Sequence, residues 1–165
     1  MQKFIRIVAI IAAVLVGLSF LLLLVSTPFQ RMIAGKVFTY SDELVGRMPI
    51  FPLPSFVNCF MLLGCTIILV VCAGNKKGGI WLELVVFFCI ALVLPFLNNI
   101  LASGYYVWMG QIRGDMHVAA ISIVNTISSW CMWPGNLGNS LALVVCGMSI
   151  VFKRMSKKLV SNTNA

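Results

Sequence analysis

Ionisable side chains are scarce in this chain. Its 165 residues include four Asp or Glu residues and one histidine, His117, and charged residues make up 10% of the sequence. Soluble domains contain about a quarter charged residues, so this chain does not belong to that class. Since a single histidine cannot build a multi-histidine site, we expect no bound metal and no other cofactor.

Paired thiols and the common catalytic motifs are also absent. None of the six cysteines forms a CxxC pair, which excludes quinone-linked disulfide oxidases and bundles that resemble vitamin K epoxide reductase. The sequence has no GxSxG element and no GxGxxG or Walker loop. Its third and fourth apolar runs lack the aspartates that four-span lipoprotein signal peptidases need. We therefore expect no enzymatic activity.

The abundant feature is apolar sequence, with 61% hydrophobic residues and a mean hydropathy of +1.03. A helix needs about 20 apolar residues to cross a bilayer. We expect an all-α integral membrane protein, a four-transmembrane-helix bundle that forms one membrane domain, 1–165. The predicted spans are 4–26, 55–73, 80–102 and 133–152, connected by 27–54, 74–79 and 103–132 and followed by a basic tail, 153–165.

The last apolar run, Val118 to Phe152, is too long for one span. A straight helix of that length would extend about 52 Å, whereas the hydrocarbon core is about 30 Å thick. We expect a division or kink at Pro134 and Gly135, with an extra amphipathic helical segment preceding or extending the last span. Pro28 is similarly expected in the first turn of a short helix lying along the membrane surface.

Lysine and arginine residues predict the orientation. Placing both termini in the cytoplasm puts eight of the twelve cations inside, which satisfies the positive-inside rule. These eight are Lys3, Arg6, Lys76, Lys77, Lys153, Arg154, Lys157 and Lys158. A re-entrant hairpin turning at Pro134 is the alternative, and it would leave the basic tail outside. The short loops and the lack of an N-x-S/T sequon are compatible with a bacterial cytoplasmic membrane.

One acid, Glu83, falls within a predicted span. An acid inside a membrane is a candidate for proton or cation coupling. Glu83 is nevertheless only about 5 Å into its helix, where it can reach the inner surface and pair with Lys76, Lys77 or the cluster at Lys153. Both interpretations stay open, and the structural one is favoured.

Asparagines converge on one level of the predicted bundle. Counted from the outer ends of their spans, five of them fall in the outer third to half of the bilayer: Asn58, Asn98, Asn99, Asn136 and Asn139. They predict either hydrogen bonds that join the helices or an outward-facing ligand pocket framed by Trp130 and Trp133 and by Pro95 and Pro134.

Small residues mark a packing face on the first span, where Ala9, Ala13 and Gly17 stand at i, i+4 and i+8. This spacing allows close approach by another helix of the bundle or of a second copy. The cysteines are expected to be packing residues, with a bridge between Cys59 and Cys131 as an alternative.

These observations predict a non-enzymatic accessory, regulatory or immunity-like protein that binds another membrane protein or a peptide. The alternative is a small oligomeric transporter, or a protein that binds a lipid or small molecule in the asparagine pocket. The expected partners are the lipid bilayer and either another membrane protein or a second copy of the chain, and not nucleic acid. The positive charge of +8 lies at span ends, where membrane orientation explains it.

Overall fold

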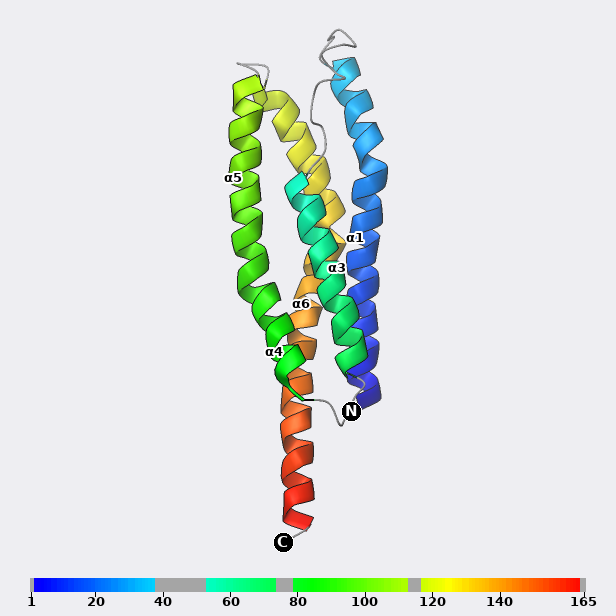
Figure 1. The fold of residues 1–165 in the computed structure, drawn as a ribbon. Coiled ribbons are helices and arrows are strands. Elements are labelled where there is room, and N and C mark those ends of the chain that lie inside the picture. Colours follow the sequence, from blue (N-terminus) through cyan, green and yellow to red (C-terminus); the bar gives the residue numbers. More distant parts are fainter. Residues whose placement is uncertain (1, 38–52, 74–78, 113–116, 164–165) are drawn as a thin grey trace.

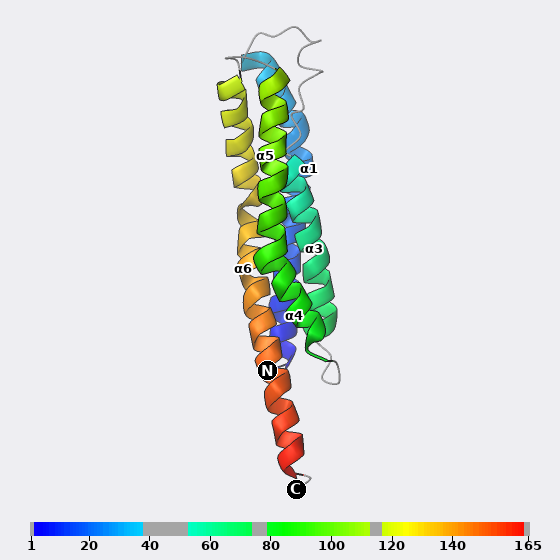
Figure 2. The same ribbon diagram turned by 60° about the vertical axis from the view of Figure 1, so that its left-hand side comes forward.

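The protein is built from long helices that lie side by side (Figures 1 and 2). The structure is a computed structural model that describes residues 2–37, 53–73, 79–112 and 117–163, with side chains for 2–28, 53–73, 79–104 and 125–157. Its elements are α1 (Gln2–Val37), α3 (Leu53–Ala73), α4 (Trp81–Phe88), the π-helix η1 (Cys89–Val93), α5 (Leu94–Ile112) and α6 (His117–Thr163).

Four of these helical segments are long and apolar enough to cross a membrane, which indicates a multi-pass membrane protein. They are Gln2–Pro28, Leu53–Ala73, Trp81–Gly104 and Asn125–Lys157. The start of α1 and the end of α6 lie at the same end of the molecule, called here the terminal end (Figure 1). The opposite end, where α3 begins, is called the distal end.

The first helix packs through a regular seam of buried residues. Its buried positions alternate in steps of four and three, which is the heptad spacing of helices that pack nearly parallel to each other. They are Ile5, Ala9, Ala12, Val16, Ser19, Leu23 and Ser26. The expected separate helix after Pro28 is wrong, because α1 continues to Val37 with Pro28 inside it. Just before the proline, the hydroxyls of Ser26 and Thr27 both donate to the Leu23 carbonyl.

Two glycines bring α6 into close contact with α1. A Cβ atom on Gly138 would lie 2.7 Å from Val16 Cγ2 and 2.8 Å from the Ala12 carbonyl oxygen. A Cβ on Gly135 would lie 2.9 Å from Ser19 Oγ. Real Cβ atoms do not approach so closely, so a side chain at Gly138 would push against the α1 backbone and one at Gly135 would displace the Ser19 hydroxyl.

The third span changes its helical pitch before Pro95. The Leu94 N–H donates to the Cys89 carbonyl, an i to i−5 bond that closes the π-helix η1. Proline has no backbone N–H, and a local π turn is one way in which a helix in lipid accommodates the missing donor. The helix then continues through α5 to Ile112, so 103–112 is helical where a connection was expected.

The last apolar run forms one helix. α6 extends from His117 to Thr163 with Pro134 inside it, so the segment before the proline extends the last span. The re-entrant hairpin turning at Pro134 is therefore wrong. The terminal part of α6 projects beyond the other helices (Figure 1).

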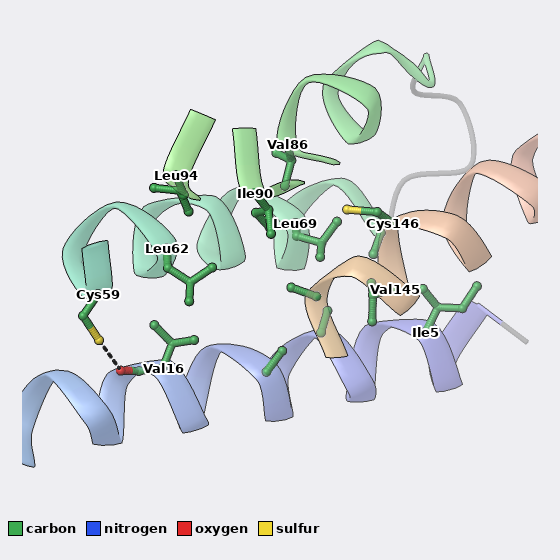
Figure 3. Packing of buried hydrophobic residues seen from close by; sticks show 14 of the residues in the cluster. Ile5, Val16, Cys59, Leu62, Leu69, Val86, Ile90, Leu94, Val145 and Cys146 are labelled. Carbon is green, nitrogen blue, oxygen red and sulfur yellow. Dashed lines mark hydrogen bonds between the residues drawn. The ribbon is translucent and has the colours of Figure 1, made fainter. Parts of the chain in front are cut away.

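The core lies where α1, α3 and α6 meet and where the third span covers α3. Figure 3 shows Leu62 and Leu69 of α3 beside Val86, Ile90 and Leu94 of the third span, while Val16 of α1 approaches from the opposite side. The Cys59 thiol donates to the Val16 carbonyl at 3.6 Å (Figure 3). All six cysteines are free, so the alternative of a Cys59 to Cys131 bridge is wrong.

Candidate functional site

Four of the five predicted asparagines surround one cavity. The cavity has a volume of about 210 Å³ and lies between α3, the third span and α6. Its amides are Asn58, Asn98, Asn136 and Asn139, and its other lining residues are Leu62, Ile90, Leu94 and Pro95. We call this space the amide cavity.

Polar and apolar side chains of the amide cavity separate along the helix axis. α3 runs from the distal end toward the terminal end, so Asn58 lies one turn closer to the distal end than Leu62. The third span runs in the opposite direction, so Asn98 lies closer to the distal end than Ile90 and Leu94. One turn of helix is about 5.4 Å. The amides of these two helices therefore lie toward the distal end of the cavity, and the aliphatic side chains lie toward its terminal end.

Asn139 has an unsatisfied acceptor in this site. Its Oδ1 atom is buried and has no hydrogen-bond partner among the described residues. Likewise, no hydrogen bond joins any two of the four amides within this described set. A buried polar atom without a partner is uncommon in native proteins and calls for a water, an ion or a ligand to pair with it. The amides line a space here instead of linking the helices directly.

The remaining predicted pocket residues lie elsewhere. Asn99 is exposed, and its carbonyl accepts a hydrogen bond from Ser103. Trp130 and Trp133 are 78% and 67% exposed on α6, where they line a separate hollow of about 420 Å³ with Ser129. Of the two prolines that were expected to frame the pocket, Pro95 lines it and Pro134 does not. On either side of Pro134, the Cys131 carbonyl and the Gly135 N–H instead bond to Ser19 of α1.

The second polar site lies near the terminal end and contains a buried ion pair. Glu83 of α4 is 0% exposed, and its Oε1 accepts hydrogen bonds from Lys153 and Ser149 of α6. Lys153 also donates to the Gly79 carbonyl at 3.1 Å. Glu83 Oε2 is buried without a partner. The predicted pairing of Glu83 with Lys153 is therefore seen, and both side chains are buried inside the protein.

The ion pair between Glu83 and Lys153 limits the chemistry that this second site can perform. A buried carboxylate next to an ammonium has its countercharge already in place. An added metal cation would have to compete with Lys153, and the described residues contain no group of three or more metal-binding side chains. The geometry supports an interhelical lock between α4 and α6.

Ser19 bridges the proline site of α6. Its hydroxyl accepts from the Gly135 N–H at 2.6 Å and donates to the Cys131 carbonyl at 2.8 Å. These two backbone groups are the i and i−4 partners that bond directly in an uninterrupted α-helix. A side chain from a neighbouring helix thus supplies the hydrogen bonds at the kink, one of the ways in which proline is tolerated within membrane helices.

The predicted small-residue stripe is divided between two neighbours. Ala9 is buried in the seam, and a Cβ on Gly17 would lie 3.9 Å from Leu63 of α3. Ala13 lines a shallow surface groove of about 320 Å³ with residues of α1 and α3. The tight contacts of α1 with Gly138 of α6 are therefore one residue away from the stripe, at Ala12 and Val16.

Sequence reasoning missed three residues of these sites. Ser19 and Gly138 belong to the close contact between α1 and α6, and Ser149 belongs to the ion pair. The signal lies between Gln2 and Pro28 of α1, where the seven buried positions follow a heptad spacing that includes Ser19. Gly135 and Gly138 follow as small residues one turn apart in an apolar helix.

Comparisons of the chain with protein-family models, with curated proteins and with solved structures found no match.

Proposed function

We propose that this chain is a small, non-enzymatic membrane protein that binds a small molecule or a lipid in the amide cavity. The observation that carries the proposal is a cavity lined by four amides, one of which, Asn139, has a buried Oδ1 without a partner. Leaving such an acceptor unpaired costs about 1–3 kcal/mol, and a ligand that donates a hydrogen bond there offsets this cost.

The size of the cavity limits the ligand. Sites for drug-sized molecules measure about 300–1,000 Å³, so about 210 Å³ suits a head group or a compact small molecule. Between helices that bend at Pro95 and Pro134, such a site is also compatible with a small oligomeric transporter.

A second candidate function is that of an accessory, regulatory or immunity-like partner of another membrane protein, of a peptide or of a second copy. The exposed pair Trp130 and Trp133 favours it, because tryptophans are enriched at the centres of protein interfaces. On this proposal the hollow beside Ser129 receives a side chain of the partner.

The proposal includes a four-helix bundle with both termini in the cytoplasm of a bacterial cell. Its support is the cluster of cations near the terminal end, at Lys3, Arg6, Arg154, Lys157 and Lys158, together with Lys76 and Lys77 in the sequence between α3 and α4. Lys153 no longer counts toward this bias, since Glu83 neutralises it. In this orientation the amide cavity lies in the outer half of the membrane.

Purification of the full chain in mild detergent, followed by native mass spectrometry, tests the proposal. We expect one bound small molecule or lipid per chain, and its loss in the variant Asn139→Leu. A stoichiometric protein partner, with no small molecule bound, would support the accessory function instead.

A further inference from the structure

The lining of the amide cavity is uncharged. Four asparagines, three aliphatic residues and a proline surround it. The nearest described acid along the third span is Glu83, roughly 22 Å of helix from Asn98 at 1.5 Å per residue, and it is paired with Lys153. A charged head group would lose its hydration here without gaining a countercharge, which is strongly unfavourable.

The unsatisfied group in the cavity is an acceptor. Within an uncharged organic ligand, only an N–H or O–H group can donate a hydrogen bond to Asn139 Oδ1. A ligand that carries ester or ether oxygens alone would leave it unpaired. The ligand must therefore bring at least one hydroxyl or amide hydrogen.

The polar and apolar residues that line the amide cavity are separated along the helix axis, which points to an amphiphilic ligand. The amides Asn58 and Asn98 lie toward the distal end, and Leu62, Ile90 and Leu94 lie one to two turns deeper. A molecule of the adjacent leaflet has the same polarity, with its head group at the interface and its chain in the core.

On the basis of the proposed binding function, we infer that the amide cavity takes a neutral amphiphile with a hydroxyl or amide head group. The head group donates to Asn139 Oδ1 and exchanges hydrogen bonds with the amides of Asn58, Asn98 and Asn136. The first part of the chain lies against Leu62, Ile90 and Leu94.

Photolabelling of the full chain in phosphatidylcholine nanodiscs tests this inference. Three probes carry the same photoreactive acyl chain: diacylglycerol, which is neutral and has a hydroxyl donor, diacylglycerol with that hydroxyl methylated, and phosphatidic acid, which is anionic. We expect saturable labelling by diacylglycerol alone, with the crosslink in the peptide that holds Leu62 or in the one that holds Ile90 and Leu94.

Matched variants locate the labelling. Asn98→Leu and Asn139→Leu should each weaken the binding of diacylglycerol about 3- to 30-fold, the range of one or two interhelical hydrogen bonds. Asn99→Leu changes the same residue type at the next position, outside the cavity, and should leave labelling unchanged. The comparison of the three probes on the unaltered chain needs no variant, so it holds even where a substitution impairs folding.

The outcomes separate the ligand class from the binding function. If phosphatidic acid labels the chain equally well and Asn98→Leu abolishes this labelling, the inference of a neutral head group would be overturned, but the amide cavity would still bind a ligand. Equal labelling by the methylated probe would overturn the need for a donor. Displacement of the diacylglycerol probe by free glycerol would overturn the inference that the ligand is an amphiphile. Labelling that neither Asn98→Leu nor Asn139→Leu reduces would overturn both the inference and the proposed function.

Discussion

Glu83 and Lys153 show how a charge is tolerated inside a membrane protein. The carboxylate is fully buried, and the ammonium is bonded to it and to the Gly79 carbonyl. Two buried charges that satisfy each other contribute little net stability compared with apolar residues, but removing one of them strands the other. The pair is best understood as a fixed connection between α4 and α6.

This leads to a prediction for the ion pair. Lys153→Met should lower the free energy of unfolding by about 3–5 kcal/mol, because Glu83 would stay buried without its countercharge. The double variant Glu83→Gln with Lys153→Met should recover part of that loss. Thermal unfolding in detergent measures both.

Arg154→Met is the matched control for this prediction. Arg154 is the neighbouring cation and is exposed, so its removal should leave stability nearly unchanged. An equal effect of Lys153→Met and Arg154→Met would contradict the account of the ion pair.

At the scale of the elements, the contact between α1 and α6 organises the protein. Glycines on α6 meet Ala12, Val16 and Ser19 of α1, and this packing leaves Asn136 and Asn139 to line the amide cavity. The same segment of α6 thus provides both a packing surface and part of the candidate site.

Gly138→Ala tests the close contact. The added Cβ would collide with Val16 and with the Ala12 carbonyl, so we expect a destabilisation of about 1–3 kcal/mol. Gly147→Ala lies on the same helix with open space around it and should be neutral or stabilising by up to about 1 kcal/mol. Chemical unfolding of the two variants compares them, and a greater loss in Gly147→Ala would refute the contact.

Ser19→Ala tests the bridge at the proline. Removing the hydroxyl leaves the Gly135 N–H and the Cys131 carbonyl to find each other across the kink, at a cost of about 0.6–2 kcal/mol. In a Pro134→Ala background the helix can close its own bond, so the same change should cost less. A double-mutant cycle by thermal unfolding measures the difference. Equal costs in the two backgrounds would disprove the bridging role.

Sequence patterns predicted the elements better than their contacts. Four apolar runs gave the four candidate spans, because length and hydropathy are local properties. The grouping of Asn58, Asn98, Asn136 and Asn139 followed from counting depth along each span. Depth alone does not give the rotation of a helix about its axis, so Asn99 and the two tryptophans were placed in the pocket although they face outward.

The continuity of the helices was harder to predict. Pro28 and Pro134 both indicated breaks, yet α1 and α6 continue through them. At Pro134 the compensating group is Ser19, which is distant in sequence and therefore invisible to any local pattern. The π turn before Pro95 is likewise a response to the missing donor that composition does not reveal.

For the whole molecule, the proposed orientation makes a direct prediction. A cysteine introduced at Ser161, in the basic tail, should react with a membrane-impermeant maleimide only after the cells are opened. A cysteine at Ser41 should react in intact cells, and the unaltered chain gives the background from the native thiols. Labelling of Ser161→Cys in intact cells would show that the orientation is the reverse of the proposed one.

The central claim is that the amides form a binding site and not a set of interhelical hydrogen bonds. Because no described protein group bonds to Asn139 Oδ1, replacing Asn139 by leucine should not lower the stability of the protein when it is stripped of ligand. The change also removes a buried acceptor that costs about 1–3 kcal/mol. The decisive measurement is the unfolding temperature of Asn139→Leu and of the unaltered chain, each stripped of ligand and then incubated with it. For the Asn139→Leu variant we predict an unchanged or higher unfolding temperature without ligand, and a smaller rise than in the unaltered chain when ligand is added. A lower unfolding temperature in the ligand-free variant would show that Asn139 holds the helices together and would contradict the account.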